Sequence, residues 1–271
     1  MNPYPKGMEI WYIFSIMLDL RKKSSRSCWL VGHRGALGLA PENTMIAFKT
    51  GLSLGADLVE CDVHLSKDRK CIVMHDESLE RTTNGTGLIR DTLWNRIKKL
   101  DAGSWNLKKF KGEKVPTLKE LLLWAKKQKT NLGLPLCVVI EIKNEPVRYF
   151  EIEKIVIETV LETGMQERVI LISFDHGVIK RAKNLNSKIS AGILYNHPLK
   201  NPFEKARHVH ADALFPRRHL VTRSLVQQAH QKGLAVATWT VNEIPEMKKM
   251  IGTGIDAIAT NFPNLLNRLL N

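Results

Sequence analysis

Three carboxylates lie within apolar runs of this sequence, where charged side chains are uncommon. Glu60 and Asp62 stand two residues apart in the run 58–63, so they share one face if this run is a strand. Glu141 stands in a second run, Cys137–Ile142. Glu60 and Asp62 alone could equally form local salt bridges. A third carboxylate adds repulsion that a cation would relieve, and oxygen ligands without sulfur suit Mg²⁺ or Ca²⁺.

Two histidines are expected at the same place as these carboxylates. His33 follows the run Trp29–Gly32, and His75 closes the run 71–74. A single histidine at such a position is more often an ordinary hydrogen-bonded residue. Two imidazoles beside one anion can act as general base and general acid near neutral pH.

Two basic side chains accompany the ionisable groups. Arg34 adjoins His33, and Lys143 stands two residues after Glu141. Arginine can bind a phosphate group through two parallel hydrogen bonds, whereas lysine binds it as a point charge. The set therefore suits a phosphate-containing substrate.

The fold must bring the ends of several strands together. From Trp29 onward, short β-branched runs alternate with amphipathic segments, which predicts crossover connections and a mostly parallel sheet. The strand-like runs are 29–32, 58–63, 71–74, 137–142, 169–174, 189–194, 213–215, 235–240 and 257–260. The helix-like segments are 44–54, 117–127, 150–163, 176–184, 222–232 and 245–251, of which 117–127 begins with a capping box.

Nine strands are one too many for an eight-stranded barrel, and the spacing resolves the excess. A turn-like stretch, residues 66–70, joins the second and third runs, whereas a parallel connection needs about a dozen residues or more. These two runs must form an antiparallel hairpin. The remaining eight strands predict a (β/α)₈ barrel, with all strand carboxyl ends on one face. A doubly wound open sheet is the alternative, although no G-x-G-x-x-G follows the first strand.

Composition excludes several protein classes. A chain of 271 residues with 44% hydrophobic residues is neither disordered nor collagen-like. Its four cysteines form no C-x-x-C pair, which predicts buried thiols in a reducing, cytoplasmic setting. The net charge of +14 favours an anionic partner. We expect no nucleic acid, because the basic residues are scattered over helix faces and aromatic residues make up only 7%.

Residues 1–28 precede the predicted barrel, which takes up residues 29–271. The apolar run 10–18 is too short to span a membrane, which takes about 20 residues, and no signal-peptidase site follows it. We expect a leader or surface helix here, with an uncleaved membrane anchor as the alternative.

A set of short motifs, in this order, resembles the glycerophosphodiester phosphodiesterase family of the phospholipase C-like phosphodiesterase superfamily. The motifs are HRG (33–35), APENT (40–44), ECDV (60–63), HD (75–76), LERTT (79–83), EIK (141–143), SF (173–174), WTVN (239–242) and TNFP (260–263). The similarity extends over about residues 29–270. It implies a TIM barrel with a small insertion after strand two, here about residues 75–115.

The resemblance also implies a role for each matching residue. By this resemblance, one divalent cation is held by Glu60, Asp62 and Glu141, and the acid/base pair is His33 and His75. The substrate is surrounded by Arg34, Lys143, Asn43 and Trp239. Of these, Asn43 is a supporting polar residue and Trp239 is an aromatic wall of the pocket. The implied reaction cleaves a small glycerophosphodiester to sn-glycerol 3-phosphate and an alcohol.

In that reaction one histidine takes a proton from the nucleophile while the other protonates the leaving alkoxide. The nucleophile is water or the glycerol 2-hydroxyl, of which the hydroxyl is the more economical because it is already held in place. The sequence leaves open the order of the histidines, the alcohol, Mg²⁺ or Ca²⁺, and the oligomeric state.

Two other functions compete with this one. A lysophospholipase D-like or phospholipase C-like enzyme would act on membrane lipids, and the basic stretch 108–111 allows membrane contact without requiring it. A non-catalytic binding protein is the second alternative, and it would need its basic residues in one groove.

Overall fold

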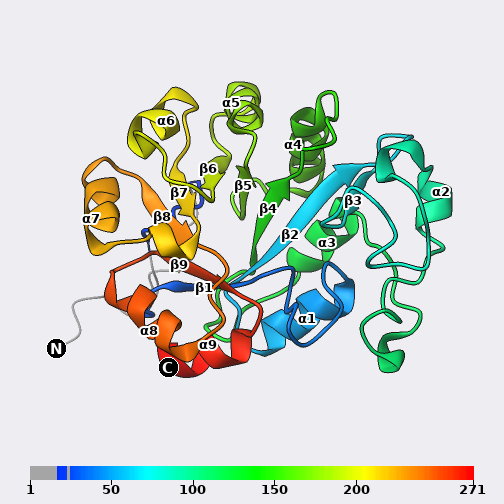
Figure 1. The fold of residues 1–271 in the computed structure, drawn as a ribbon, viewed down its shortest axis with the longest axis horizontal. Coiled ribbons are helices and arrows are strands. Elements are labelled where there is room, and N and C mark those ends of the chain that lie inside the picture. Colours follow the sequence, from blue (N-terminus) through cyan, green and yellow to red (C-terminus); the bar gives the residue numbers. More distant parts are fainter. Residues whose placement is uncertain (1–16, 23–24) are drawn as a thin grey trace, which may run out of the picture.

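The computed structural model describes residues 17–22 and 25–271. In this part of the chain, eight parallel strands close into a barrel with helices around it (Figure 1). The barrel strands are β1 (Trp29–Gly32), β2 (Leu58–Leu65), β4 (Cys137–Ile142), β5 (Val169–Ser173), β6 (Ser190–Tyr195), β7 (Ala213–Pro216), β8 (Ala235–Thr238) and β9 (Ala257–Thr260). β1 pairs with both β2 and β9, which closes the barrel and confirms the predicted TIM-barrel fold.

The predicted hairpin is also confirmed. β3 (Cys71–Val73) runs antiparallel to the end of β2, with Val63 opposite Val73. Ser66 shapes the turn: its hydroxyl donates to Asp68 at 2.8 Å and accepts the backbone N–H of Lys70 at 2.9 Å. A short turn of this kind can reverse the chain but cannot carry it back for a parallel pairing.

Helices cover the outside of the barrel. They are α1 (Met45–Ser53), α2 (Trp94–Ile97), α3 (Leu118–Ala125), α4 (Ile152–Thr163), α5 (His176–Leu185), α6 (Pro202–His208), α7 (Arg223–Gln231), α8 (Ile244–Gly252) and α9 (Pro263–Leu270). The capping box predicted at Thr117 and Glu120 starts α3. The sequence patterns predict neither α6 nor α9. Both are short and begin with proline, which is suited to the first helical position but reads as a turn signal in isolation.

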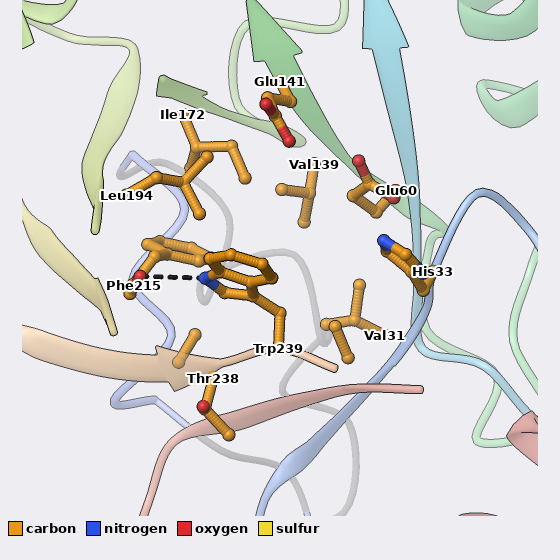
Figure 2. Close-up of a pocket in the computed structure, with 12 residues that line it drawn as sticks. Val31, His33, Glu60, Val139, Glu141, Ile172, Leu194, Phe215, Thr238 and Trp239 are labelled. Atoms are coloured by element: carbon orange, nitrogen blue, oxygen red, sulfur yellow. Dashed lines mark hydrogen bonds between the residues drawn. The ribbon is translucent and has the colours of Figure 1, made fainter. Parts of the chain in front are cut away.

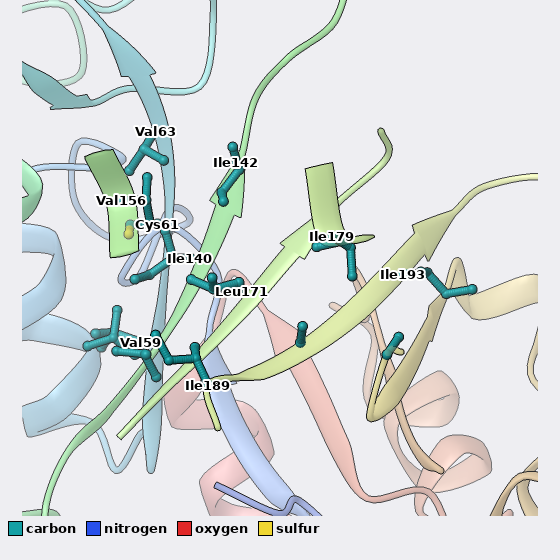
Figure 3. Close-up of a cluster of buried hydrophobic side chains, with 14 of the residues drawn as sticks. Val59, Cys61, Val63, Ile140, Ile142, Val156, Leu171, Ile179, Ile189 and Ile193 are labelled. Carbon is teal, nitrogen blue, oxygen red and sulfur yellow. The ribbon is translucent and has the colours of Figure 1, made fainter. Parts of the chain in front are cut away.

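The side chains of β2 alternate between the outside of the barrel, where they pack with apolar neighbours, and its inside, where the site lies. Val59, Cys61 and Val63 point outward and pack with neighbouring strands and helices (Figure 3). Glu60 and Asp62, at the intervening positions, point into the barrel. This alternation follows from the two-residue period of a strand.

The residues between β3 and α3 form an insertion with an apolar cluster of its own. It includes two 3₁₀ turns, η2 (Ile89–Asp91) and η3 (Lys108–Phe110), as well as α2, and lies to one side of the barrel in Figure 1. The buried members of the cluster are Ile72, Met74, Leu79, Ile89, Ile97, Ala102 and Val115. The insertion therefore packs against the hairpin that carries His75.

A short segment before β1 packs against the barrel interior. Leu20 is 2% exposed and belongs to the apolar cluster inside the barrel. Its carbonyl accepts from the indole N–H of Trp29 at 2.9 Å, and the carbonyl of Leu18 accepts from Ser190 at 2.5 Å. Trp29 and Ser190 begin their strands, so the segment lies at the amino-terminal ends of the barrel strands.

The expectation of a leader or surface helix concerns residues that lie largely outside the described part of the chain. Residues 10–16 of the apolar run are among them, and residues 17–22 and 25–28 contain no helix. Among the described residues, no helix combines the length and hydropathy needed to cross a membrane.

Candidate active site

The structure brings the three carboxylates together at the carboxyl ends of two neighbouring strands. Asp62 on β2 is the cross-strand partner of Glu141 on β4, and Glu60 precedes Asp62 on the same inward face. Each carboxylate offers one oxygen, and these oxygens lie within 4.8 Å of one another. Glu60 and Asp62 are buried, and the side chain of Glu141 is 12% exposed.

The pKa values of these three carboxyl groups are shifted from their usual values. Burial raises the pKa of Glu60 well above its usual value, and the charges of Asp62 and Glu141 raise it further. Burial also raises the pKa of Glu141. At Asp62 burial acts in the same direction, but Lys143 and Arg34 outweigh it and hold the pKa well below its usual range. Three clustered carboxylate oxygens in so little water fit a hard divalent cation, which would favour the ionised form of all three.

Lys143 lies against two of the carboxylates. Its ammonium is 3.0 Å from Asp62, and it also donates to Glu141. The two-residue spacing of Glu141 and Lys143 accounts for this arrangement, because both side chains project to the same face of β4 and the residues that extend it.

The HRG motif turns the chain sharply after β1. Arg34 has φ of 49°, and its backbone N–H donates to Glu60 at 2.8 Å. Its guanidinium donates to Glu42 at 2.7 Å and lies 3.3 Å from Asp62. The next residue, Gly35, has φ of 86°, and a Cβ there would lie 2.4 Å from the backbone of Ala47, so only glycine fits.

Asn43 contacts Asp62, one of the three candidate metal ligands, directly. Its amide nitrogen donates to the Asp62 carboxylate at 2.8 Å, and its amide oxygen accepts the backbone N–H of Asp62 at 3.3 Å. Its φ is 57°, a left-handed conformation that asparagine tolerates better than most residues. Both polar groups of Asn43 are thus engaged by Asp62.

The two histidines have different partners on the same ring nitrogen. Nδ1 of His33 is 2.7 Å from the side-chain oxygen of Asn261, which can only accept, so this nitrogen carries the hydrogen. Nδ1 of His75 is 2.7 Å from the carboxylate of Asp76. Burial and the neighbouring charge of Arg34 lower the pKa of His33 to about 4. Both rings therefore keep Nε2 for proton transfer.

Trp239 forms one wall of a pocket inside the barrel mouth (Figure 2). Its indole N–H donates to the carbonyl of Phe215 at 3.0 Å. The Phe174 ring packs edge to face against the indole, with 5.5 Å between the ring centroids. β8 ends at Thr238, two residues before the predicted end of the run, and Trp239 still forms an isolated parallel bridge with Arg217. The other residues lining the pocket are Val31, His33, Glu60, Val139, Glu141, Ile172, Leu194, Phe215, Ala237, Thr238 and Ala259.

This pocket, with the open solvent at its mouth, has a volume of about 390 Å³. One side carries His33, Glu60 and Glu141, and the other side is apolar (Figure 2). His75 instead lines a smaller neighbouring pocket together with Glu42 and Asn43. The pocket therefore has an acidic side, at two of the candidate metal ligands, and an apolar side that suits carbon-rich groups.

Sequence reasoning assigned no role to several residues that the structure places at the site. Glu42, Asp76, Arg81 and Asn261 are hydrogen-bonded to predicted site residues or to their partners. All four lie inside the motifs quoted above, so their place in those motifs could have marked them as site residues. His64 was missed as well, although it shares the inward face of Glu60 and Asp62.

His64 is buried beside the second histidine. Its two ring nitrogens lie 3.0 Å from the Tyr149 hydroxyl and 3.0 Å from the backbone carbonyl of His75. Burial lowers the pKa of His64 to about 4. It is thus a neutral structural support for the chain segment that carries His75.

Comparisons with known proteins point to one family. A model of the glycerophosphoryl diester phosphodiesterase family matches residues 33–265. A glycerophosphodiester phosphodiesterase of Caldanaerobacter subterraneus subsp. tengcongensis is 38% identical over 242 residues, which cover 89% of this chain and 97% of that protein.

Solved structures agree with the sequence comparisons. The glycerophosphodiester phosphodiesterase of Agrobacterium tumefaciens superimposes with a TM-score of 0.78 at 28% identity, over 89% of this chain and 99% of that one. A phosphodiesterase of Oleispira antarctica, solved in complex with the product sn-glycerol-3-phosphate, has a TM-score of 0.77 at 27% identity, over 89% of this chain and 95% of that one.

Proposed function

Since this chain belongs to the glycerophosphoryl diester phosphodiesterase family, we propose that it hydrolyses glycerophosphodiesters to sn-glycerol 3-phosphate and an alcohol. The observation that carries this proposal is the cluster of three carboxylates at the carboxyl ends of the barrel strands, with Arg34 and Lys143 against Asp62. That face is where TIM-barrel enzymes place their chemistry. His33 lines the same pocket as Glu60 and Glu141, and His75 lines a second, smaller pocket. The barrel with its insertion, residues 29–271, is the catalytic unit in this proposal.

Glu60, Asp62 and Glu141 are the residues that would hold one divalent cation, Mg²⁺ or Ca²⁺. Bound there, the ion would supply positive charge next to the phosphoryl oxygens. Asn43 supports the site by fixing the carboxylate of Asp62. Arg34 and Lys143 contribute charge that also faces the phosphate.

The different partners of the histidines suggest their order. His33 is neutral near pH 7 and keeps the lone pair of Nε2, so it accepts the proton of the nucleophile. Nδ1 of His75 lies 2.7 Å from the Asp76 carboxylate, which fixes the orientation of the ring, so we assign His75 the protonation of the leaving alkoxide. The glycerol 2-hydroxyl attacks phosphorus as the bond to the alcohol oxygen breaks. The cyclic phosphate is then opened by water with the two histidine roles reversed.

Trp239 and the apolar side of the pocket cover the carbon atoms of the glycerol group. This wall holds the glycerol so that its 2-hydroxyl lies near phosphorus, and it keeps bulk water away. The arrangement therefore favours attack by the substrate's own hydroxyl in the first step.

Replacing the histidines tests the assignment. His33→Gln and His75→Gln each remove a proton-transfer group but keep a polar side chain, so we expect kcat to fall about 10²- to 10⁴-fold. Release of sn-glycerol 3-phosphate from glycerophosphocholine is measured in a coupled assay, with circular dichroism to check folding. His208→Gln, at an exposed position of α6, is the matched control. Near-normal turnover in either site variant would refute the pairing.

Removing divalent cations tests the carboxylate site. Chelation with EDTA should abolish the activity, and titration with Mg²⁺ or Ca²⁺ should restore it and identify the preferred ion. Glu60→Gln should require a higher concentration of the same ion, because one charged ligand is lost. Full activity after exhaustive chelation would exclude the metal.

One surface feature favours a second candidate, a lysophospholipase D-like activity on membrane lipids. In the insertion, Trp105 is 37% and Leu107 is 52% exposed, and Lys108 and Lys109 follow them directly. Exposed apolar side chains among lysines suit an anionic lipid surface. Hydrolysis of lysophosphatidylcholine, together with sedimentation on anionic vesicles that Trp105→Ser weakens, would support this candidate. Activity on glycerophosphocholine alone would exclude it.

A further inference from the structure

Arg81, which lies in the insertion, joins two separate parts of the site. Its guanidinium donates to the Asp76 carboxylate at 2.6 and 2.9 Å and to the Glu42 carboxylate at 2.8 and 2.9 Å. One side chain therefore makes a two-point contact with each of two carboxylates. Only arginine has the planar set of donors for this geometry.

Each of these carboxylates holds a residue of the proposed reaction. Asp76 accepts from Nδ1 of His75 at 2.7 Å, and Glu42 accepts from the guanidinium of Arg34 at 2.7 Å. Arg81 is thus linked to His75 through Asp76 and to Arg34 through Glu42. We propose that Arg81 is a positioning residue that sets the orientations of His75 and Arg34 together. This inference rests on the proposed function, in which His75 and Arg34 act on the phosphate.

The charges at this junction balance only if Arg81 is present. Glu42 has a buried side chain, 3% exposed, which by itself would raise its pKa. The hydrogen bonds and charges of Arg81 and Arg34 reverse that effect and keep Glu42 ionised. The hydrogen bonds of Arg81 likewise hold the pKa of Asp76 well below its usual range. Without Arg81, Arg34 would be the one cationic partner of Glu42 among the residues that the structure describes, and Asp76 would be free to rotate away from His75.

The insertion fixes the backbone of Arg81 firmly. Leu79 is fully buried in the apolar cluster of the insertion, and its carbonyl accepts from both the backbone N–H and the hydroxyl of Thr83, at 3.1 and 2.5 Å. Arg81 lies in the middle of this turn. The packing of the insertion thereby fixes the position of Arg81, and through Asp76 and Glu42 it fixes the positions of His75 and Arg34.

Kinetics of Arg81 variants test the inference. In Arg81→Ala we expect kcat to fall about 10- to 100-fold, because His75 is misoriented, and KM to rise a few-fold, because Arg34 is displaced. Arg81→Lys should recover the thermal midpoint of unfolding but leave kcat at least about tenfold low, because an ammonium cannot bind both carboxylates in two-point contacts. Arg90→Ala, also in the insertion and in one exposed ion pair, is the control and should stay within about twofold of wild type.

A double-mutant cycle shows whether Arg81 acts through Asp76. If it does, kcat of Asp76→Ala/Arg81→Ala should be about that of Asp76→Ala, whereas independent effects would multiply. Multiplied losses, wild-type kcat in Arg81→Ala, or full recovery in Arg81→Lys would each overturn the inference. If Arg81→Ala does not fold, Arg81→Lys decides alone. A wild-type protein without diesterase activity would instead refute the proposed function.

Discussion

At the scale of single residues, side chains of the same type have different neighbouring charges and hydrogen-bond partners. Among the carboxylates, Asp62 is stabilised in its ionised form by Lys143 and Arg34, whereas burial raises the pKa of Glu60. Between the histidines, His33 meets a neutral amide and His75 meets a carboxylate. Such divergence is common where one group must accept a proton and another must donate it.

The pKa of His33 leads to a prediction for the pH dependence of catalysis. Burial and the charge of Arg34 disfavour the protonated ring, so His33 stays neutral until the pH falls to about 4. The acid limb of kcat/KM, measured with saturating metal ion, should therefore lie well below the ordinary histidine value of about 6.5. Arg34→Gln removes one of the two causes and should move this limb to higher pH, in addition to lowering kcat/KM.

The control for this measurement is Arg90→Gln, which alters an exposed arginine of the insertion and should leave the limb in place. An acid limb near pH 6.5 in the wild type, unmoved by Arg34→Gln, would show that His33 is not the base.

At the scale of elements, β2 organises the site. Its alternate residues supply the outward apolar layer and the inward groups Glu60, Asp62 and His64. The hairpin with β3 then carries His75 back toward the site, and the insertion packs against that hairpin. The outward face of β2 thus serves packing alone, whereas its inward face carries Leu58 of the interior apolar cluster as well as the site residues.

The segment before β1 permits a test of the opposite end of the barrel. Leu20→Ala should leave a cavity in the barrel interior and lower the free energy of unfolding by about 2–5 kcal/mol. Activity at 25 °C should stay near wild type, because the amino-terminal ends of barrel strands contribute stability rather than catalysis. Urea denaturation and the coupled assay measure the two effects.

Leu107→Ala is the matched control, because Leu107 is 52% exposed and its truncation should change stability by less than about 0.5 kcal/mol. If Leu20→Ala were as stable as this control, the segment would not contribute to the barrel core.

At the scale of the whole molecule, the excess of basic residues matters for encounter with substrate. The net charge is +14, and Arg34 and Lys143 lie against Asp62 in the carboxylate cluster. A positive field raises the association rate of anions and is screened by salt. The charge therefore has a kinetic consequence that does not require a nucleic-acid partner.

This field predicts a salt effect that depends on the substrate. For glycerophosphoglycerol, which is anionic, kcat/KM should fall several-fold between about 0.05 and 0.5 M NaCl, while kcat stays nearly constant. Glycerophosphocholine carries a compensating cation and should show a much smaller effect. Equal salt dependence for the two substrates would show that the field does not guide binding.

The sequence by itself determined the parts of the protein that depend on short spacing. The two-residue interval between Glu60 and Asp62 places both on one strand face, and the short turn after β2 requires a hairpin. The capping box likewise marks the start of α3. These features depend on backbone geometry over a few residues, so they could be predicted without knowing what lies beside them.

Only the tertiary structure decided which side chain meets which across the barrel. Closure places β1 between β2 and β9, so Asn261 reaches His33 although 228 residues separate them. Packing of the insertion brings Arg81 onto Glu42 and Asp76, and the same folding directs Asn43 to Asp62. Such pairings depend on the simultaneous positions of several elements, and no local period in the chain encodes those positions.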